Sequence, residues 1–336
     1  MTMRRILITG ATGFIGAHLL IRLLQEDDTR IRATFRSAAA FDELKLIASF
    51  YGIGLSRLFN EVEWVKVDLL DKVALDRAMF DIDEVYHCAA VVSFDSASAQ
   101  KLLQTNVEGT GNIVKACLRK EVGKLCFISS IGALNGINAD GMVDEDCFDK
   151  PVAGSVYSAS KHYSEQEVWD GVALGLDVVI LNPGIVLGPG NTRKGSLRFF
   201  DTVRKGILFY TAGVTGYVDV RDVAKAATEC MNRDLFNRRM LLVSENLSYQ
   251  QLLTMIAREY GKTPPFIRAG KPLLALASLF SGWKARFTGQ QPKFTKETMA
   301  SAVKITNYDS SRTRAQLGFD LISISETVKV VCGFNS

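Results

Sequence analysis

Short apolar runs alternate with longer segments in which apolar residues recur every three or four positions. The short runs predict buried strands, and the longer segments predict helices that bury one face. The predicted strands span residues 4–9, 31–35, 62–67, 85–87, 124–128 and 178–181. The predicted helices span residues 14–24, 41–50, 72–80, 99–119 and 158–173. This alternation predicts an α/β fold, a doubly wound parallel sheet of the Rossmann type with helices on both faces.

The pattern changes after Pro183. Residues 184–195 are rich in Gly and Pro, and the later helical segments no longer alternate with clear strands. A strand followed by a helix is again predicted over residues 217–231, and a further strand over 239–243. We therefore expect a sheet domain formed by residues 1–183, to which residues 214–245 return, and a smaller, mostly helical lobe formed by residues 184–213 and 246–336.

Composition excludes several function classes. The chain has 336 residues, 47% of them apolar and 23% charged, and its net charge of +4 includes no long basic run, so we expect no nucleic-acid partner. Six scattered Cys without a Cys-x-x-Cys motif favour a reducing compartment. No apolar run reaches the roughly 20 residues of a spanning helix, and the first strand leaves no room for a signal peptide. We expect a cytoplasmic protein without stable membrane insertion.

A glycine loop follows the first predicted strand. Gly10-Ala-Thr-Gly13-Phe-Ile-Gly16 opens an apolar helix, the context in which such a loop binds a dinucleotide. Gly10 permits a sharp turn, Gly13 admits a pyrophosphate, and Gly16 lets helix and strand pack closely. The alternative is a plain strand-to-helix turn. We predict that the sheet domain binds a dinucleotide through this loop, with contacts from Thr12, Phe14 and Ile15.

The end of the second strand decides between the two nicotinamide cofactors. A site for NAD places an acidic residue there, whereas this chain has Arg36, which can pair with a 2′-phosphate. NADP(H) is therefore favoured, NAD(H) stays possible, and an ordinary solvated Arg is the alternative. Asp68 and Leu69, after the third strand, are candidates for the adenine edge.

Tyr157 and Lys161 are candidates for acid–base chemistry. One helical turn would place the phenol beside the ammonium, and Lys161 together with an oxidised nicotinamide would lower the pKa of Tyr157 from its usual value near 10. Ser129 and Ser130 end a predicted strand, where one hydroxyl could steady a substrate oxygen. A solvent-facing pair and a helix cap are the plain alternatives. His18, His87 and His162 lack metal-ligand spacing, so we expect no metal site.

These motifs, together with Val85-Tyr-His-Cys-Ala-Ala90 and Asn182-Pro-Gly-Ile-Val-Leu-Gly-Pro189, resemble the extended short-chain dehydrogenase/reductase superfamily, also called the NAD-dependent epimerase/dehydratase family. The resemblance covers most of the chain. It implies that Ser130 is the catalytic serine and that a homodimer is plausible. It further implies cofactor contacts from Ala89, Ala90, Lys161, Pro183, Gly184 and Ile185.

Departures from the family pattern reduce the number of activities that the chain could have. Ile131 and Gly132 stand where sugar dehydratases carry Asp and Glu, and Ile185 and Thr215 stand where nucleotide-sugar epimerases carry Asn and Arg. The segments Arg32-Ala-Thr-Phe-Arg36, Ser129-Ser-Ile-Gly-Ala-Leu-Asn135 and Tyr217-Val-Asp-Val-Arg-Asp-Val-Ala224 resemble instead the branch of dihydroflavonol reductases and 3β-hydroxysteroid dehydrogenases. In that branch Asn135 would face the substrate. A Lys that helps bind the 2′-phosphate there maps to Glu43, with Lys45 nearby.

We therefore expect an NADP(H)-dependent oxidoreductase that reduces a ketone or aldehyde, or oxidises the matching alcohol. Two alternatives stay open: a nucleotide-sugar 4-epimerase with tightly bound NAD, and a non-catalytic dinucleotide-binding protein. Val92 and Phe94 are further candidates to line the substrate side of the site, and we expect the smaller lobe to bind the substrate. Residues 273–283 could line a pocket, a core or a membrane surface.

Overall fold

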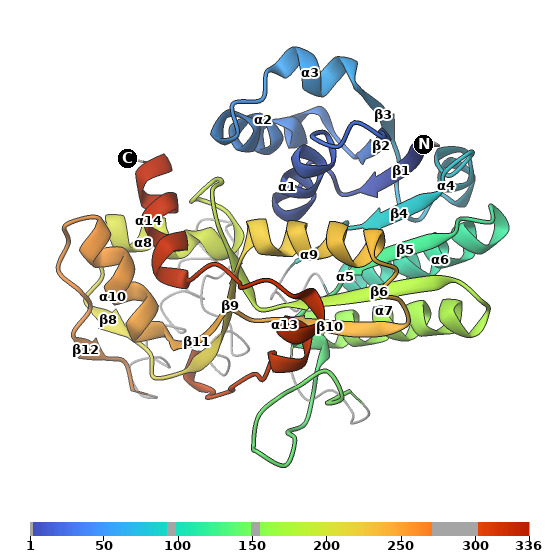
Figure 1. Cartoon of the computed structure of the whole chain (residues 1–336). Coiled ribbons are helices and arrows are strands. Elements are labelled where there is room, and N and C mark those ends of the chain that lie inside the picture. Colours follow the sequence, from blue (N-terminus) through green and yellow to red (C-terminus); the bar gives the residue numbers. More distant parts are fainter. Residues whose placement is uncertain (1–2, 93–98, 149–154, 271–301, 336) are drawn as a thin grey trace.

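The computed structural model describes residues 3–92, 99–148, 155–270 and 302–335 (Figure 1). Its central sheet has seven strands, in the order β10-β6-β5-β4-β1-β2-β3, and all its pairings are parallel. This confirms the predicted doubly wound parallel sheet. The strands are β1 (Arg4–Thr9), β2 (Thr29–Phe35), β3 (Val62–Lys66), β4 (Glu84–His87), β5 (Lys124–Ile128), β6 (Asp177–Pro183) and β10 (Arg238–Leu242).

Helices cover both faces of this sheet. On one face α1 (Phe14–Leu23) packs against α2 (Phe41–Phe50) and α9 (Val220–Asn232). On the other face α6 (Gly109–Arg119) packs against α4 (Lys72–Ala78) and α7 (Val156–Ala173). The short helix α3 (Leu55–Asn60), which the sequence pattern did not predict, precedes β3.

The central strand β1 shows why its three middle residues are all apolar. Ile6 and Ile8 belong to the core on the α1 side of the sheet, whereas Leu7 belongs to the core on the α6 side, and all three are fully buried. A strand covered on both faces needs apolar residues at consecutive positions. The order of strands reverses between β1 and β4, so a crevice is expected beyond their carboxyl ends.

The segment predicted as one helix over residues 99–119 has three parts. A π-helical turn (Gln104–Glu108) separates α5 (Ala99–Leu103) from α6. The turn lets Asn106 reach the backbone of Val91 with both ends of its amide: the Asn106 Nδ2 donates to the Val91 carbonyl at 2.9 Å, and the Val91 N–H donates to Asn106 Oδ1 at 2.8 Å. The interruption thus positions the chain that follows β4.

The smaller lobe contains more strands than the pattern predicted. A three-stranded sheet, β11-β9-β7, pairs β9 in parallel with β7 and antiparallel with β11, and a second small sheet pairs β8 with β12. The strands are β7 (Ile185–Leu187), β8 (Phe209–Tyr210), β9 (Val214–Asp219), β11 (Glu245–Ser248) and β12 (Ile267–Arg268). Of the segment 214–245, β10 joins the large sheet, whereas β9 belongs to the small one.

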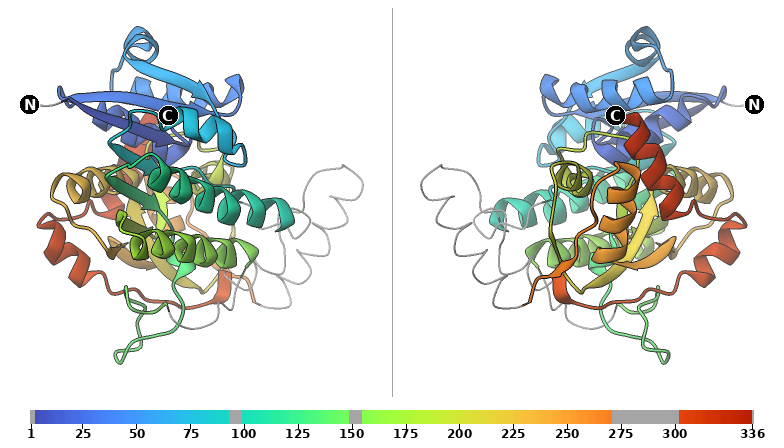
Figure 2. Two further views of the ribbon diagram at one scale, coloured as in Figure 1. Left: turned by 90° about the vertical axis from the view of Figure 1, so that its right-hand side faces the viewer. Right: turned by 90° about the vertical axis from the view of Figure 1, so that its left-hand side faces the viewer.

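Helices complete the smaller lobe around a separate apolar core. Figure 2 shows α14 (Ile324–Phe334) beside α10 (Tyr249–Glu259), which also contacts α8 (Arg198–Arg204). α13 (Ser311–Leu317) packs against α9 and β10. α10 ends at Glu259, and residues 273–283 lie outside the described residues. Within the described ranges, none of the helices has both the length and the apolarity to cross a bilayer.

Candidate active site

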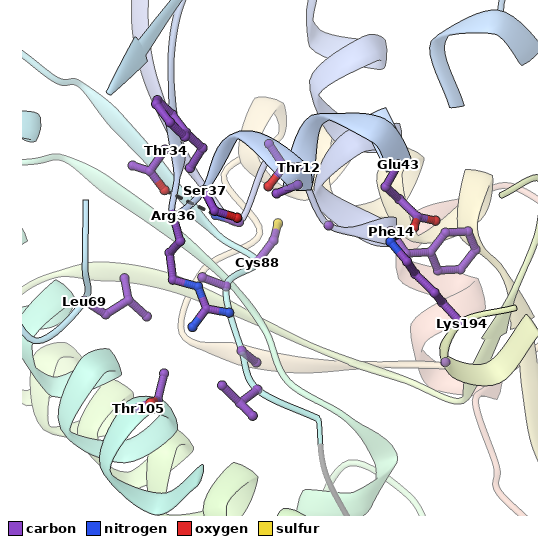
Figure 3. A pocket seen from close by; sticks show the side chains of 18 of the residues that line it. Thr12, Phe14, Thr34, Arg36, Ser37, Glu43, Leu69, Cys88, Thr105 and Lys194 are labelled. Atoms are coloured by element: carbon purple, nitrogen blue, oxygen red, sulfur yellow. Dashed lines mark hydrogen bonds and ion pairs between the residues drawn. The ribbon is translucent and has the colours of Figure 1, made fainter. Parts of the chain in front are cut away.

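A cleft with a volume of about 410 Å³ lies at the carboxyl ends of β1, β2, β3 and β4 (Figure 3). Both parts of the chain contribute to its wall. From the sheet domain come the predicted contacts Gly10, Thr12, Gly13, Phe14, Arg36, Asp68, Leu69, Ala89 and Ala90, together with Thr34, Ser37, Glu43 and Cys88. The smaller lobe contributes Asn191, Lys194, Gly195, Ser196 and Leu197.

The glycine loop fits a dinucleotide because side chains are excluded where it turns. Gly10 has a φ of 71°, and a Cβ there would lie 2.7 Å from the backbone of Ala89. A Cβ on Gly16 would collide with the carbonyl of Gly10. Gly13 precedes α1 without a side-chain hydrogen bond to the helix, so the N–H groups of the first turn are left for a pyrophosphate. Ile15 packs against the core on the α1 side.

Arg36 is exposed on the wall of the cleft and makes no ion pair with any described residue. Arg32, four residues earlier, has a structural role instead. It pairs with Glu63 at 2.9 Å and donates to the carbonyls of Ala78 and Phe80 at 2.8 Å. Of these two cations at the end of β2, Arg36 is therefore the one available to an anion in the cleft.

Asp68 and Leu69 form the wall at the end of β3. The Asp68 carboxylate accepts the backbone N–H of Leu70 at 3.0 Å, which shapes the turn. Leu69 is buried against Gly109 of α6, and its carbonyl accepts the Asn112 amide at 3.0 Å. The turn is thus held from α6, which keeps this wall in place beside the cleft.

Ser130 and Tyr157 meet across the gap between β5 and α7. Ser130 follows β5, where its hydroxyl accepts the Gly132 N–H at 3.0 Å, and it shares a side-chain hydrogen bond with Tyr157. Tyr157 and Lys161 lie one turn apart near the start of α7, which the Ser155 hydroxyl caps by accepting the N–H of Ser158. The structure therefore brings a hydroxyl, a phenol and an ammonium to one place.

Burial changes the acidity of this group. It lowers the pKa of Lys161 to about 8, although the Glu165 carboxylate opposes the change. The Lys161 Nζ donates to the Ile128 carbonyl at 2.8 Å. Burial also raises the pKa of Tyr157, and the hydrogen bond with Ser130 offsets this only in part. Desolvation of the phenolate dominates among the described residues, and the lowering expected from Lys161 together with an oxidised nicotinamide stays a prediction.

The group of Ser130, Tyr157 and Lys161 borders the cleft through Cys88. The Cys88 side chain lines the cleft, and the charge of Lys161 acts on its thiol, although burial still raises the pKa of Cys88 to about 12. Figure 3 shows the sulfur pointing into the cavity between Thr12 and Arg36. A nicotinamide extending along this wall would approach Lys161.

The remaining predicted residues lie farther along the sheet edge. Pro183 ends β6 and is buried, and the Gly184 N–H donates to the Leu242 carbonyl at 2.9 Å. Ile185 begins β7, opposite Tyr217 of β9. Asn135 is half-buried, and its backbone N–H donates to the Cys147 carbonyl at 2.6 Å. Val92 is exposed, and Phe94 lies outside the described residues.

The sequence analysis missed a buried carboxylate next to the candidate catalytic residues. Glu165 is fully buried and accepts three hydrogen bonds: from Ser129 Oγ at 2.5 Å, from Asn182 Nδ2 at 2.6 Å and from Arg239 Nε at 2.7 Å. It joins α7 to β5, β6 and β10. Its spacing was the available signal, because Tyr157, Lys161 and Glu165 recur every four residues and so share one face of a helix.

No group of three or more His, Cys, Asp or Glu suited to a metal ion occurs among residues 3–92, 99–148, 155–270 and 302–335. The chemistry that this part of the chain offers is hydrogen bonding and proton transfer at Ser130 and Tyr157, next to a cleft shaped for a dinucleotide.

Comparisons with known proteins agree with this geometry. Sterol demethylase protein B of Methylococcus capsulatus is 28% identical over 93% of this chain and 92% of its own length. A bifunctional dihydroflavonol 4-reductase/flavanone 4-reductase of Pyrus communis is 30% identical over 54% of each chain. The two relatives support a place in the extended reductase branch.

A solved structure and a family model complete the comparison. The UDP-glucose 4-epimerase of Thermotoga maritima, solved with UDP-glucose, superposes with a TM-score of 0.75 over 98% of both chains, and its 19% identity shows the shared fold alone. The model of the NAD dependent epimerase/dehydratase family matches residues 6–238, from β1 to the start of β10. The chain therefore belongs to the NAD-dependent epimerase/dehydratase family and is an NAD(P)-dependent enzyme of the extended short-chain dehydrogenase/reductase type.

Proposed function

We propose that the protein is an NADP(H)-dependent oxidoreductase that reduces a ketone or aldehyde, or oxidises the matching alcohol. The observation that carries the proposal is the hydrogen bond between Ser130 and Tyr157, with the buried Lys161 one turn away and the dinucleotide cleft alongside. Carbonyl reduction requires a proton donor within reach of the oxygen that receives the charge. Tyr157 is that donor in our proposal.

Each residue has a distinct role in this proposal. Bound nicotinamide supplies a hydride or accepts one. Ser130 orients the carbonyl oxygen, and Tyr157 donates a proton to it. Because burial raises the pKa of Tyr157, the phenol stays protonated at neutral pH, as reduction requires. Lys161 would hold the nicotinamide ribose, and its charge would favour the phenolate that forms when the proton leaves.

The preference for NADP(H) rests on Arg36. Its guanidinium points into the cleft on the side of Leu69, without an ion pair to any described residue (Figure 3). A guanidinium can bind a phosphate through two parallel hydrogen bonds, which would favour the cofactor that carries a 2′-phosphate. NAD(H) is the alternative cofactor.

The proposed substrate class rests on the two positions at which nucleotide-sugar epimerases bind the diphosphate of their substrate. Ile185 is part of β7, and the Thr215 hydroxyl forms a hydrogen bond with Tyr308 within the protein. Neither supplies an anion-binding group. We therefore favour a carbonyl compound without a nucleotide, contacted by Asn135, Val92 and Phe94 of the sheet domain and bound by the lobe of residues 184–213 and 246–336. A cytoplasmic homodimer belongs to the same proposal.

Replacing Tyr157 by Phe tests the proposed mechanism. A panel of ketones and aldehydes is screened with NADPH, and consumption of the reduced nicotinamide is followed. We expect Tyr157→Phe to lower turnover by roughly 10²-fold or more, because proton transfer loses its donor. Tyr163→Phe is the matched control, since Tyr163 lies on the same helix and is 49% exposed.

Full turnover by Tyr157→Phe would refute the mechanism. The same screen separates the epimerase alternative, because an epimerase returns its hydride and consumes no cofactor. A nicotinamide that survives dialysis and is not consumed would favour that alternative over a reductase.

A further inference from the structure

The loop of residues 189–197 belongs to the smaller lobe and contacts α1 and α2 of the sheet domain. The Pro189 carbonyl lies 2.9 Å from His18 Nε2 on α1. Gly190 lies against the ring of Phe14, so closely that a Cβ would stand 3.0 Å from it. These contacts place the loop across the start of α1, at the glycine-loop end of the cleft.

An ion pair continues this contact onto α2. The Lys194 Nζ lies 3.0 Å from Glu43 Oε2, and the Asn191 N–H donates to Glu43 Oε1 at 3.3 Å. The Glu43 side chain is only 8% exposed, whereas that of Lys194 is 60% exposed. Glu43 is therefore fixed from two sides by the loop, and it holds the ammonium at the wall of the cleft.

The position of this ammonium is informative. Figure 3 shows Lys194 and Glu43 next to Phe14, the first residue of α1, on the side of the cavity away from Arg36, so Glu43 does not lie beside Arg36 as the resemblance implied for a residue at the 2′-phosphate. The uncapped N–H groups of α1 belong to this side, so the cofactor's pyrophosphate would lie there. Two cations thus line the cleft at separate places, one for each phosphate group of NADP(H).

We infer that Lys194 is a second phosphate-binding cation of the cofactor site, contributed by the smaller lobe and held over the pyrophosphate by Glu43. The inference rests on the proposed binding of a dinucleotide in this cleft. A buried carboxylate near a pyrophosphate would repel it. Lys194 removes that repulsion and adds an attraction, so the pair would also tie the two lobes together when cofactor binds.

Cofactor binding can distinguish the proposed role of Lys194 from that of Arg36. Both cofactors contain the pyrophosphate, but only NADP(H) contains the 2′-phosphate. Lys194→Met should therefore weaken NADPH and NADH by a similar factor, roughly tenfold, whereas Arg36→Met should weaken NADPH selectively. Both losses should shrink as salt is raised, because these side chains are exposed to solvent.

Binding is measured on the full-length protein by the fluorescence of the reduced nicotinamide, without any substrate. Lys205→Met is the matched control, since Lys205 is an exposed lysine of the same lobe that pairs with Asp201. The double variant Glu43→Gln/Lys194→Met should recover part of the lost affinity, because it removes the unpaired carboxylate as well. Thermal melting verifies that each variant is folded.

Wild-type affinity of Lys194→Met for both cofactors would overturn the inference, and so would a loss confined to NADPH. Equal affinity of the wild type for NADPH and NADH would refute the proposed preference for NADP(H), yet a common loss in Lys194→Met would still support this inference. Failure of the wild type to bind either cofactor would refute the site and this inference with it.

Discussion

Lys161 is a charged side chain that the fold places in an unfavourable environment. It is 3% exposed, and its ammonium has a carbonyl and the ring of Phe127 as neighbours, with the ring centroid 5.0 Å from Nζ. Desolvation lowers its pKa from 10.5 to about 8. The protein therefore accepts a loss of stability at the residue on which the proposed chemistry depends, a common property of active sites.

The low pKa of Lys161 predicts how stability changes with pH. The unfolded chain binds this proton up to pH 10.5, but the folded chain releases it near pH 8, so the free energy of unfolding rises with pH between these values. The cost of burying the ammonium is fully present below pH 8. We expect Lys161→Met to stabilise the protein most at pH 7, and the gain to shrink by up to roughly 3 kcal/mol by pH 10.5.

Urea unfolding of the wild type and of Lys161→Met at pH 7, 9 and 10 measures this difference. Lys205→Met, which removes an exposed ammonium, serves as the reference. A stability difference between Lys161→Met and the wild type that does not change with pH would contradict the prediction.

At the scale of elements, the glycine loop combines two constraints that can be separated. Gly10 has a φ of 71° and also lies against the backbone of Ala89, whereas Gly261 has a φ of 60° with open space around it. Substitution by Ala imposes a similar backbone cost at both positions. Any additional loss of stability in Gly10→Ala therefore measures how closely the end of β1 approaches the segment after β4.

We expect Gly261→Ala to cost about 1 kcal/mol, the price of a left-handed conformation for Ala. Gly10→Ala should cost several times more and should also abolish NADPH binding, because backbone must shift to make room for the Cβ. Urea unfolding and nicotinamide fluorescence give the two readings. Similar losses of stability for both variants would show that the approach to Ala89 is not tight.

The sequence predicted the elements of the large sheet well because burial on both faces leaves a strong signal. Apolar runs marked strands such as β1, β5 and β6, and the glycines marked the cofactor loop. The sequence did not predict elements with weaker signals. β8 and β12 have two residues each, too few to show a periodic pattern. The π-helical turn at Gln104–Glu108 resembles an ordinary helix in sequence.

The site could be predicted only where a local motif carries the chemistry. Tyr157 and Lys161 are one turn apart, so their spacing predicted that they share a helix face. The contact between Glu43 and Lys194 joins residues far apart in the chain, and no local pattern encodes it. The acidity of Tyr157 also depends on how deeply the phenol is buried, which the motif does not specify.

At the scale of the whole molecule, the cleft lies between the two lobes. Its walls come from the ends of β1 to β4 and from the loop of residues 189–197. A cofactor bound there would contact both parts, so it should stabilise both, and by about 2.7 kcal/mol at a concentration one hundred times its Kd.

Hydrogen exchange tests this coupling. We expect saturating NADPH to slow amide exchange in residues 10–16 and also in residues 189–197, because both segments would close on one ligand. α3, which lies outside the cleft, provides the internal reference. Protection confined to the glycine loop would mean that the smaller lobe does not take part in cofactor binding.

The double burial of β1 has a consequence for how the chain finds its alignment during folding. A strand with one apolar face is held in place because sliding by one residue would expose that face. β1 has no such safeguard, since either face accepts Ile6, Leu7 or Ile8. Its position along the sheet must be set at its ends, by the Asp83 carboxylate that accepts the N–H of Arg5 at 2.8 Å and by the contact of 2.6 Å between Thr9 Oγ1 and His87 Nδ1. Thr9, directly before the glycine loop, thus also helps to set the register of the sheet.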